Sequence, residues 1–220
     1  NRYINILPFN SSRVKLIDSS LESDYINASY VRMNNSTFIA AQAPQPEEFE
    51  AFFLMLWQTG CDLVVMLTNF IERGRIKADD YFPNPYSEYP SISVELRSQI
   101  PHDHFIVREL CLRKNDEKKV VMHFQYLKWP DHGVPDAVSL LEMMRLVAHT
   151  QKNPQAPTTI HCSAGIGRTG TYIIIKVLLE DFTLAKQIPP PFNLMKILEH
   201  LRSQRSGLLT SFDQYEFCYS

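Results

Sequence analysis

The chain has 220 residues, of which 45% are hydrophobic and 21% are charged. This composition excludes disordered and fibrous proteins, and the length is sufficient for one domain with a sizeable core. The formal net charge is −2 at pH 7, so the chain has no broad basic field and nucleic acid is not expected as a partner. Any anion-binding site must therefore be local.

The four cysteines, Cys61, Cys111, Cys162 and Cys218, lie far apart and form neither a Cys-x-x-Cys pair nor a zinc-site spacing. We therefore expect free thiols, a cytoplasmic location and no metal. The sequence has no apolar run of the roughly 18 residues that a membrane span needs, so direct membrane insertion is not expected. Because the chain begins at Asn1 without a methionine, it also fits the intracellular part of a longer or membrane-tethered protein.

The first part of the chain contains one clear helix and two strand candidates. From Pro46 to Trp57, apolar residues recur at helical spacing after a proline and two glutamates that suit a helix N-terminus. Residues 63–68 are a short β-branched apolar run, and residues 120–128 are a longer run that ends at Trp129-Pro130. Both runs predict strands of a sheet.

The second part of the chain alternates between helix and strand. Apolar periodicity predicts helices over residues 140–147 and 194–201, and residues 158–161 predict a strand. A further helix is expected to open near Arg168 and to continue as a buried helix through residues 172–179. This alternation predicts an α/β domain whose mixed sheet is covered by helices. No repeat or low-complexity linker divides the sequence, so residues 1–220 are expected to form one domain.

The most specific motif lies between the predicted strand and the predicted helix. It is the run His161-Cys162-Ser163-Ala164-Gly165-Ile166-Gly167-Arg168-Thr169-Gly170. A dianionic phosphate requires several inward-facing backbone N–H groups, and the two inner glycines allow the φ values and the close approach that such a loop demands. The following helix adds the positive end of its dipole. The motif therefore predicts an anion cradle.

The same field would stabilise a thiolate at Cys162, which lies among the loop amides, beside His161 and near Arg168. Cys162 is then a nucleophile at neutral pH. The planar fork of Arg168 can bind two phosphate oxygens and follow them as charge redistributes in the transition state, which a lysine could not do.

Two other interpretations of this motif are less consistent with the sequence. Most lone cysteines at a strand end are buried structural residues, but here the cysteine is followed by a glycine-containing loop and an arginine. A nucleotide-binding loop would end in Gly-Lys-Ser or Gly-Lys-Thr, which is absent from this motif.

Cleavage of an aryl phosphate also needs an acid that protonates the departing phenolate. The run Trp129-Pro130-Asp131-His132-Gly133-Val134-Pro135 presents Asp131 on a loop bounded by prolines. A carboxyl on a mobile loop can deliver its proton when the loop closes and then accept one from the hydrolytic water. Alone, this run is also typical of a tight turn. Next to the cysteine motif, we interpret Asp131 as the general acid and base.

The two motifs together resemble the phosphotyrosine-specific branch of the protein tyrosine phosphatases, and the resemblance extends along nearly the whole chain. Asn1-Arg2-Tyr3 resembles the phosphotyrosine-recognition loop of that family, and residues 24–29 and 42–44 resemble two more of its signatures. The resemblance implies a single domain with a highly twisted mixed sheet flanked by helices, and a phosphate-binding loop between a strand and a helix. It also implies catalysis without a cofactor, acting on phosphotyrosine-containing proteins.

The resemblance also implies a role for each matching residue. Tyr3 would stack on the substrate ring in a pocket too deep for phosphoserine or phosphothreonine, Glu72 would pair with Arg168, and Lys77 would lie near Asp131. The remaining roles are backbone amides from Ser163, Ala164, Gly165, Ile166 and Gly167, a hydroxyl for the leaving thiolate from Thr169, a loop hinge at Trp129, and support of the cradle and pocket rim by Arg202 and Arg205. For both arginines, a basic helix end is the plainer alternative.

Three features depart from the family pattern. Asn5 occupies a position where the family usually has an aspartate, which predicts weaker binding of the peptide backbone. Thr210 occupies the place of the glutamine that normally positions the hydrolytic water. Gln214 matches the second glutamine of that region and either substitutes for the missing amide or is occupied in a helix capping box with Ser211. The third departure is extent, because the family's N-terminal helices are absent before Asn1 and the chain stops within the C-terminal helix.

The sequence therefore predicts a protein-tyrosine-phosphatase with Cys162 as its nucleophile. Thr210 motivates a second hypothesis, in which the chain binds phosphotyrosine as a pseudophosphatase and turns it over poorly. A third hypothesis, a dual-specificity phosphatase, shares the cysteine loop but usually lacks a segment such as Asn1-Arg2-Tyr3.

Overall fold

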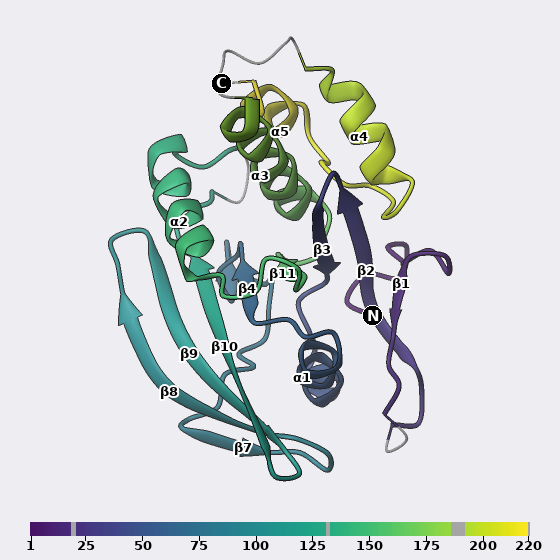
Figure 1. Ribbon diagram of the computed structural model, residues 1–220, viewed down its shortest axis with the longest axis vertical. Coiled ribbons are helices and arrows are strands. Elements are labelled where there is room, and N and C mark those ends of the chain that lie inside the picture. The colour runs from purple at the N-terminus through teal and green to yellow at the C-terminus, as the bar shows by residue number, and fades with distance from the viewer. Residues whose placement is uncertain (19–20, 131–132, 186–191, 220) are drawn as a thin grey trace.

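The computed structural model describes residues 1–18, 21–130, 133–185 and 192–219 (Figure 1). The strands are β1 (Arg13–Lys15), β2 (Tyr25–Met33), β3 (Ser36–Ala41), β4 (Leu63–Met66), β5 (Ile71–Glu72), β6 (Arg75–Ile76), β7 (Tyr86–Glu88), β8 (Ser93–Pro101), β9 (Phe105–Lys114), β10 (Glu117–Tyr126) and β11 (Thr158–His161). The helices are the 3₁₀ turn η1 (Pro46–Glu48), α1 (Phe49–Gln58), α2 (Ala137–Thr150), α3 (Gly167–Ala185), α4 (Leu194–Arg202) and α5 (Phe212–Phe217).

Nine of the strands form one mixed sheet in the order β1-β2-β3-β11-β4-β10-β9-β8-β7. The central strands β3, β11, β4 and β10 run parallel to one another, whereas the outer pairs on both sides are antiparallel. Parallel strands must be covered on both faces, and β4 and β11 are correspondingly buried along their whole length. The twisted mixed sheet that the sequence predicts is confirmed (Figure 1).

Helices cover both faces of the sheet and define two hydrophobic clusters. On one face, α1 contributes Phe52 to Leu56, which pack with Val64 and Met66 of β4. On the other face, α2, α3, α4 and α5 pack over residues such as Val65 and Ile160. The strands β4 and β11 therefore form the centre of the molecule, and the loops at their carboxyl ends are held by both layers.

The predicted helices and strands are confirmed, with differences at their ends. The strand expected at residues 120–128 is β10, which begins three residues earlier at Glu117 and ends at Tyr126. Its first residues pair with the end of β9. They are exposed and polar, so a search for apolar runs could not include them in the strand. Helix α2 is longer than the predicted 140–147 because Asp136 caps it, accepting a hydrogen bond from the Ser139 amide at 2.9 Å.

Several strands were not predicted from the sequence. Strands β8 and β9 are stabilised by cross-strand polar pairs, such as Arg113 with Glu95 at 2.7 Å, as well as by apolar contacts. Strand β2 carries buried polar residues, Asn27 and Ser29, between buried apolar residues such as Ala28. A strand is predicted from a run of β-branched and other apolar residues. These strands mix polar and apolar residues, so they were not recognised in this way.

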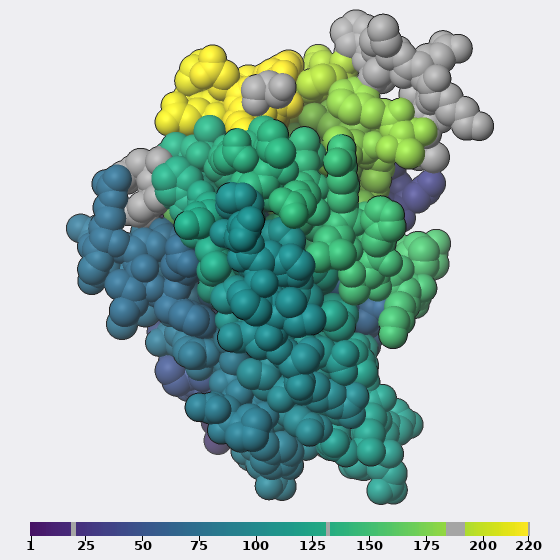
Figure 2. Space-filling view, turned by 90° about the vertical axis from the view of Figure 1, so that its left-hand side faces the viewer, coloured from purple at the N-terminus to yellow at the C-terminus, as the bar shows by residue number. Residues whose placement is uncertain are grey.

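The outer strands and α2 form one side of the molecule. In Figure 2, the blue-to-teal segment that contains β8, β9 and β10 occupies the lower half of this side, and the green helix α2 lies above it. Within the described ranges, none of the helices combines the length and the apolar character needed to cross a membrane.

Candidate active site

The predicted anion cradle is the loop between the end of β11 at His161 and the start of α3 at Gly167. Gly165 has φ +70°, and a Cβ on it would lie 2.0 Å from the Ala41 carbonyl oxygen at the end of β3. Gly167 is already helical, so it contributes close approach but no positive φ: a Cβ there would lie 2.6 Å from Oγ1 of Thr210. The loop is therefore compressed between β3 and residues 207–210.

Replacing Gly165 by alanine is expected to disrupt the cradle. The new Cβ would collide with backbone atoms and would also force a side chain into the left-handed region, and neither can be relieved by rotating a neighbouring side chain. We expect Gly165→Ala to lose more than about 3 kcal/mol of stability or all phosphate affinity. Thermal unfolding and phosphate titration would measure both, with Gly74→Ala as a control, because Gly74 has φ +74° but nothing within 4 Å of its Cβ position. Equal behaviour of the two variants would contradict the close-approach argument.

Cys162 lies inside this cradle and is 6% exposed. Its Sγ accepts a hydrogen bond from the Thr169 hydroxyl at 3.3 Å, which is the contact expected of a group that assists a leaving thiolate. Thr169 is fully buried in the first turn of α3. The sulfur therefore faces the positive end of a helix of 19 residues.

Arg168 is held by a bidentate ion pair, as the family resemblance implies. Its two terminal nitrogens donate to the two carboxylate oxygens of Glu72 at 2.6 and 2.7 Å. One of them also donates to the Leu67 carbonyl at 3.0 Å, and the other to the Pro130 carbonyl at 3.2 Å. Glu72 comes from the β5–β6 hairpin and is 8% exposed. The guanidinium is thereby fixed in one plane.

The Glu72 carboxylate is itself anchored by the segment that follows β4. Its Oε1 atom accepts hydrogen bonds from the Thr68 hydroxyl at 2.9 Å and from the Asn69 amide at 3.2 Å. Asn69 also ties this segment to the Leu127 carbonyl, through its side-chain amide, at 3.1 Å. The orientation of Arg168 consequently depends on residues from three separate parts of the chain.

Asp131 lies outside the described residues, so its role and its proximity to Lys77 remain predictions. The residues on either side of it are described. The indole nitrogen of Trp129 donates to the Gly133 carbonyl at 3.3 Å, and the Trp129 ring lies 5.9 Å from the Arg168 guanidinium carbon. Trp129, which is 3% exposed, and Gly133 are thus connected to each other close to Arg168.

His161 is fully buried next to the nucleophile, and burial lowers its pKa to about 4. It is therefore neutral at physiological pH and adds no formal charge to the field at Cys162. Its Nδ1 atom donates to the Cys162 carbonyl at 3.1 Å, so Nε2 is left to accept from the Tyr81 hydroxyl at 2.7 Å. His161 acts by holding the backbone of the loop.

The buried histidines make stability depend on pH. Burial lowers the pKa of His161 to about 4 and that of His123 well below its usual range. Since the unfolded state takes up these protons near pH 6.5 and the folded state does not, stability is greatest above pH 6.5 and declines as pH falls towards 4. We expect a loss of roughly 3 kcal/mol from His161 alone across that window.

Urea unfolding near pH 7 and near pH 4.5 would test this expectation, because stabilisation from exposed carboxyls with lowered pKa values, such as Asp24 and Glu95, is lost mainly below that window. An unfolding free energy that stays constant between the two pH values would contradict it.

The N-terminal segment lies beside the cradle. The Tyr3 hydroxyl is hydrogen-bonded to Oγ of Ser163 at 2.9 Å, which places the ring at the loop. The guanidinium of Arg2 secures this segment by bonds to Asp79 at 2.6 Å and to the Ala43 carbonyl at 3.2 Å. Asn5 is exposed two residues further on. The structure therefore brings the predicted recognition loop to the predicted cradle.

Arg205 supports the cradle through hydrogen bonds to its backbone carbonyls. It is 1% exposed, and it donates to the carbonyls of Gly165 at 2.8 Å and Ala164 at 3.1 Å. Burial lowers the pKa of Arg205 to about 10, so it remains a cation at neutral pH. The alternative of a basic helix end is wrong for Arg205, which lies beyond the end of α4. Arg202 is the last residue of α4, but it donates to the carbonyls of Leu208 and Leu209 at 2.9 and 2.7 Å and so supports the loop before Thr210.

Thr210 and Gln214 together occupy the place next to Gly167. Oε1 of Gln214 accepts from the Thr210 amide at 3.1 Å and from its hydroxyl at 3.3 Å. Ser211 caps α5 by accepting from the Gln214 amide at 3.2 Å, but the Gln214 side chain bonds to Thr210 and not back to the Ser211 amide. The capping box is therefore only half formed. A Cβ on Gly167 would lie 3.3 Å from Nε2 of Gln214, so the donor end of this amide borders the cradle.

Sequence reasoning missed Tyr81 and Thr68, which touch His161 and Glu72 respectively. Tyr81 is far in the sequence from His161, and Thr68 is far from Arg168, which it supports through Glu72. Neither belongs to a local motif, so the sequence contains no spacing that could have identified them.

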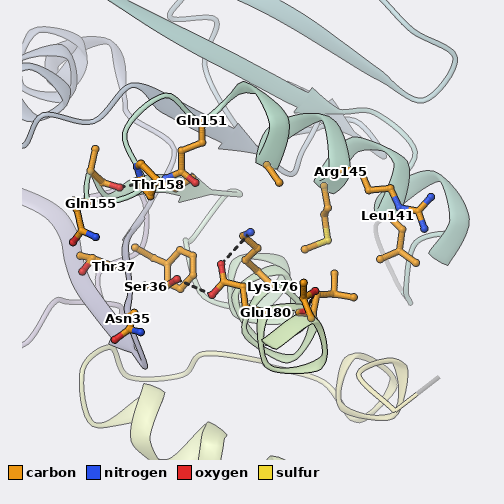
Figure 3. Close-up of a pocket in the computed structure, with 17 residues that line it drawn as sticks. Asn35, Ser36, Thr37, Leu141, Arg145, Gln151, Gln155, Thr158, Lys176 and Glu180 are labelled. Atoms are coloured by element: carbon orange, nitrogen blue, oxygen red, sulfur yellow. Dashed lines mark hydrogen bonds and ion pairs between the residues drawn. The ribbon is translucent and has the colours of Figure 1, made fainter. Parts of the chain in front are cut away.

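A separate cavity of about 690 Å³ lies between β3, α2 and α3 (Figure 3). Lys176 and Glu180 project into it from α3 and form an ion pair at 3.0 Å, and Glu180 also accepts from the Ser36 hydroxyl at 2.7 Å. It is lined by Ser36 and Thr158, which begin the parallel strands β3 and β11, whereas Cys162 follows the end of β11. This cavity is therefore at the opposite end of the strands from the cradle.

Comparison with known proteins agrees with this geometry. The family described as protein-tyrosine phosphatase matches residues 1–220. Human receptor-type tyrosine-protein phosphatase zeta is 38% identical over 238 residues, which cover 100% of this chain and 10% of that protein. Rat tyrosine-protein phosphatase non-receptor type 20 is 35% identical over 229 residues, which cover 100% of this chain and 52% of that protein. The chain thus spans between a tenth and about half of the length of these two relatives. It belongs to the protein-tyrosine phosphatase family.

Proposed function

We propose that this chain hydrolyses phosphotyrosine in proteins through a phospho-cysteine intermediate at Cys162. The observation that carries the proposal is the position of the Cys162 sulfur at the N-terminus of α3, where it accepts a hydrogen bond from Thr169. The first turn of the same helix carries Arg168, whose guanidinium Glu72 holds in a bidentate pair. A thiolate, a fixed fork of donors and a ring of backbone amides are together suited to a transferring phosphoryl group.

In the first step, the Cys162 thiolate attacks phosphorus in line with the tyrosine oxygen. The S–P bond forms as the P–O bond breaks, and Asp131 donates a proton to the departing phenolate. Arg168 and the amides of residues 163–167 stabilise the equatorial oxygens. In the second step, water attacks phosphorus and gives its proton to Asp131, the S–P bond breaks, and Thr169 donates a hydrogen bond to the thiolate that leaves.

Tyr3 is proposed to select phosphotyrosine. Its hydroxyl reaches Ser163 of the cradle, so its ring forms one wall of the entrance. A phosphotyrosine side chain is long enough to extend past this ring and bring its phosphate to the sulfur, whereas phosphoserine and phosphothreonine would be too short. Phosphotyrosine-containing proteins are the expected partners, and exposed Asn5 would bind their backbone without the charge of an aspartate.

Steady-state release of phosphate from a phosphotyrosine peptide, with and without vanadate, tests the proposal. We expect turnover that vanadate inhibits, with far slower release from the matching phosphothreonine peptide. Comparable rates on both peptides would favour a dual-specificity phosphatase. Absence of vanadate-sensitive turnover would contradict the proposal.

Replacement of Asp131 by alanine should slow catalysis while leaving binding intact. Loss of a general acid typically costs about 10²–10⁴-fold in rate, since the phenolate would have to leave unprotonated. We expect kcat on a phosphotyrosine peptide to fall by this factor with little change in peptide affinity. Asp136, the cap of α2, provides the control Asp136→Asn, which keeps a capping side chain. Parental kcat in Asp131→Ala would rule out Asp131 as the acid.

A second candidate is a phosphotyrosine-binding pseudophosphatase. The observation that favours it is the pair of hydrogen bonds by which Thr210 occupies Oε1 of Gln214, in the place where an amide would orient water. Rapid-quench kinetics separate the candidates. A burst of about one equivalent of tyrosine followed by negligible phosphate release would favour the binder. Steady release of phosphate would favour the phosphatase.

A cytoplasmic location is proposed on chemical grounds. The four cysteines are free thiols, and the mechanism requires Cys162 to remain reduced. Location on the cytoplasmic side also fits the intracellular part of a longer protein.

A further inference from the structure

A buried guanidinium lies behind the site and has no role in the proposed reaction. Arg108, in the middle of β9, is 5% exposed. Its Nε atom donates to Oε1 of Gln99 at 2.6 Å, its Nη1 atom donates to Oε1 of Gln125 at 2.9 Å, and its carbon Cζ lies 4.1 Å from the centre of the Phe82 ring. Both hydrogen bonds go to neutral amides. Burying a cation in this way costs free energy, so its retention calls for a reason.

The strand register places these residues in a row across three neighbouring strands. Gln99 of β8 lies opposite Arg108 of β9, which lies opposite His123 of β10. Gln125 is two residues further along β10 and therefore shares the same face. It pairs in register with Met66, the last residue of β4. The row thus leads from the outer strands of the sheet (Figure 1) to the point where β4 ends below the active site.

Arg108 determines the orientation of the Gln125 amide. Because a guanidinium only donates, Gln125 must turn Oε1 towards Arg108, and this directs its Nε2 atom to the Thr68 carbonyl, to which it donates at 3.2 Å. If the amide were flipped, its NH₂ group would face the Arg108 donor and its oxygen would face the Thr68 carbonyl oxygen, so neither hydrogen bond could form. A neutral side chain at position 108 would leave the orientation of this amide undetermined.

Thr68 transmits this constraint to the catalytic arginine. Its carbonyl is held by Gln125, and its hydroxyl donates to Oε1 of Glu72 at 2.9 Å, which in turn accepts from Arg168. The preceding residue, Leu67, donates through its amide to the His161 carbonyl at 2.8 Å and accepts from Arg168 at 3.0 Å. Displacing residues 67–68 would therefore shift the carboxylate that aligns the phosphate-binding fork.

We infer that Arg108 and Gln125 are positioning residues, which act through Thr68 and Glu72 to hold Arg168 in the geometry that binds phosphate. The inference rests on the proposed function. It assigns a role in oxyanion binding to two residues of the outer sheet that do not touch the substrate.

The test compares Gln125→Met with the matched control Gln99→Met, measured as the affinity for inorganic phosphate and as kcat and KM on a phosphotyrosine peptide. Each variant removes one acceptor from the same guanidinium, but only Gln125 contacts Thr68. We expect phosphate affinity to weaken on the order of tenfold in Gln125→Met and by less than about twofold in Gln99→Met. Equal phosphate affinities in the two folded variants would overturn the inference.

Thr68→Val provides a second, independent arm, because it removes the hydroxyl that bonds Glu72 while keeping the size of the side chain. It should weaken phosphate binding by a similar factor, and the double variant Gln125→Met/Thr68→Val should lose little more than the larger single loss. Unchanged phosphate binding in Thr68→Val would overturn the inference even if Gln125→Met failed to fold. Where both variants fold, losses that multiply fully would also overturn it. A parent protein that bound phosphate but released no product would contradict the proposed function alone.

Discussion

Cys162→Ser is expected to abolish turnover of phosphotyrosine peptides, with kcat falling on the order of 10⁴-fold or more. A serine hydroxyl at this position would be a far weaker nucleophile than the cysteine sulfur that the proposed mechanism requires. The cradle itself would be unchanged, because Thr169 can donate its hydrogen bond to a serine oxygen as well as to the cysteine sulfur. The hydrogen bond from Arg205 to the Gly165 carbonyl does not involve position 162. Single-turnover and steady-state kinetics on one peptide would measure the loss.

Two controls make this result specific. Phosphate should still bind to Cys162→Ser with an affinity close to that of the parent, which would show that the cradle has folded. Cys111→Ser should retain parental kcat, since Cys111 lies in β9, where its Sγ donates to the Leu112 carbonyl at 4.0 Å and a hydroxyl can replace it. Turnover near the parental rate in Cys162→Ser would refute the covalent mechanism.

Arg168→Lys is the second large effect, with an expected loss of about 10²–10³-fold in kcat/KM. Lysine keeps the charge but not the planar fork, so it can neither bridge both oxygens of Glu72 nor bind two phosphate oxygens at once. The Glu72 carboxylate, 8% exposed, would also lose one of its two charge-assisted bonds.

Both kcat/KM and phosphate affinity should decline in Arg168→Lys, because the fork acts on the bound anion as well as on the transition state. Arg145→Lys, on the exposed face of α2, serves as the matched control. Activity within about threefold of the parent in Arg168→Lys would mean that charge alone suffices and that the bidentate geometry is not used.

The central elements of the fold could be predicted because their residues are buried on both faces. Strand β11 is buried along its whole length, helix α3 carries a largely apolar stretch at residues 172–179, and the two enclose a glycine-containing loop, which leaves few alternatives. Strands β8 and β9 could not be found in this way. Residues such as Glu95 and Arg113 stabilise them by pairing across strands, and such pairing depends on register, which a sequence pattern does not specify.

The residues of the site likewise divide into those that a local motif predicts and those whose contacts depend on the folded chain. Cys162, Arg168 and Thr169 lie within one motif, so their chemistry follows from local spacing. The roles of Glu72, Arg205 and Tyr3 came from family resemblance, and their contacts with Arg168, Gly165 and Ser163 are long-range. The neutral state of His161 depends on burial by distant residues, which no local pattern records.

The proposed mechanism requires Cys162 to react as the nucleophile inside a phosphate-binding cradle. Alkylation by iodoacetate near pH 6.5, followed by mass spectrometry of the modified cysteine, tests it most directly. We expect rapid, selective modification of Cys162 that parallels loss of activity and is prevented by vanadate or phosphate. A thiol at Cys162 that reacts no faster than the other buried cysteines, at a rate unaffected by either anion, would contradict the account.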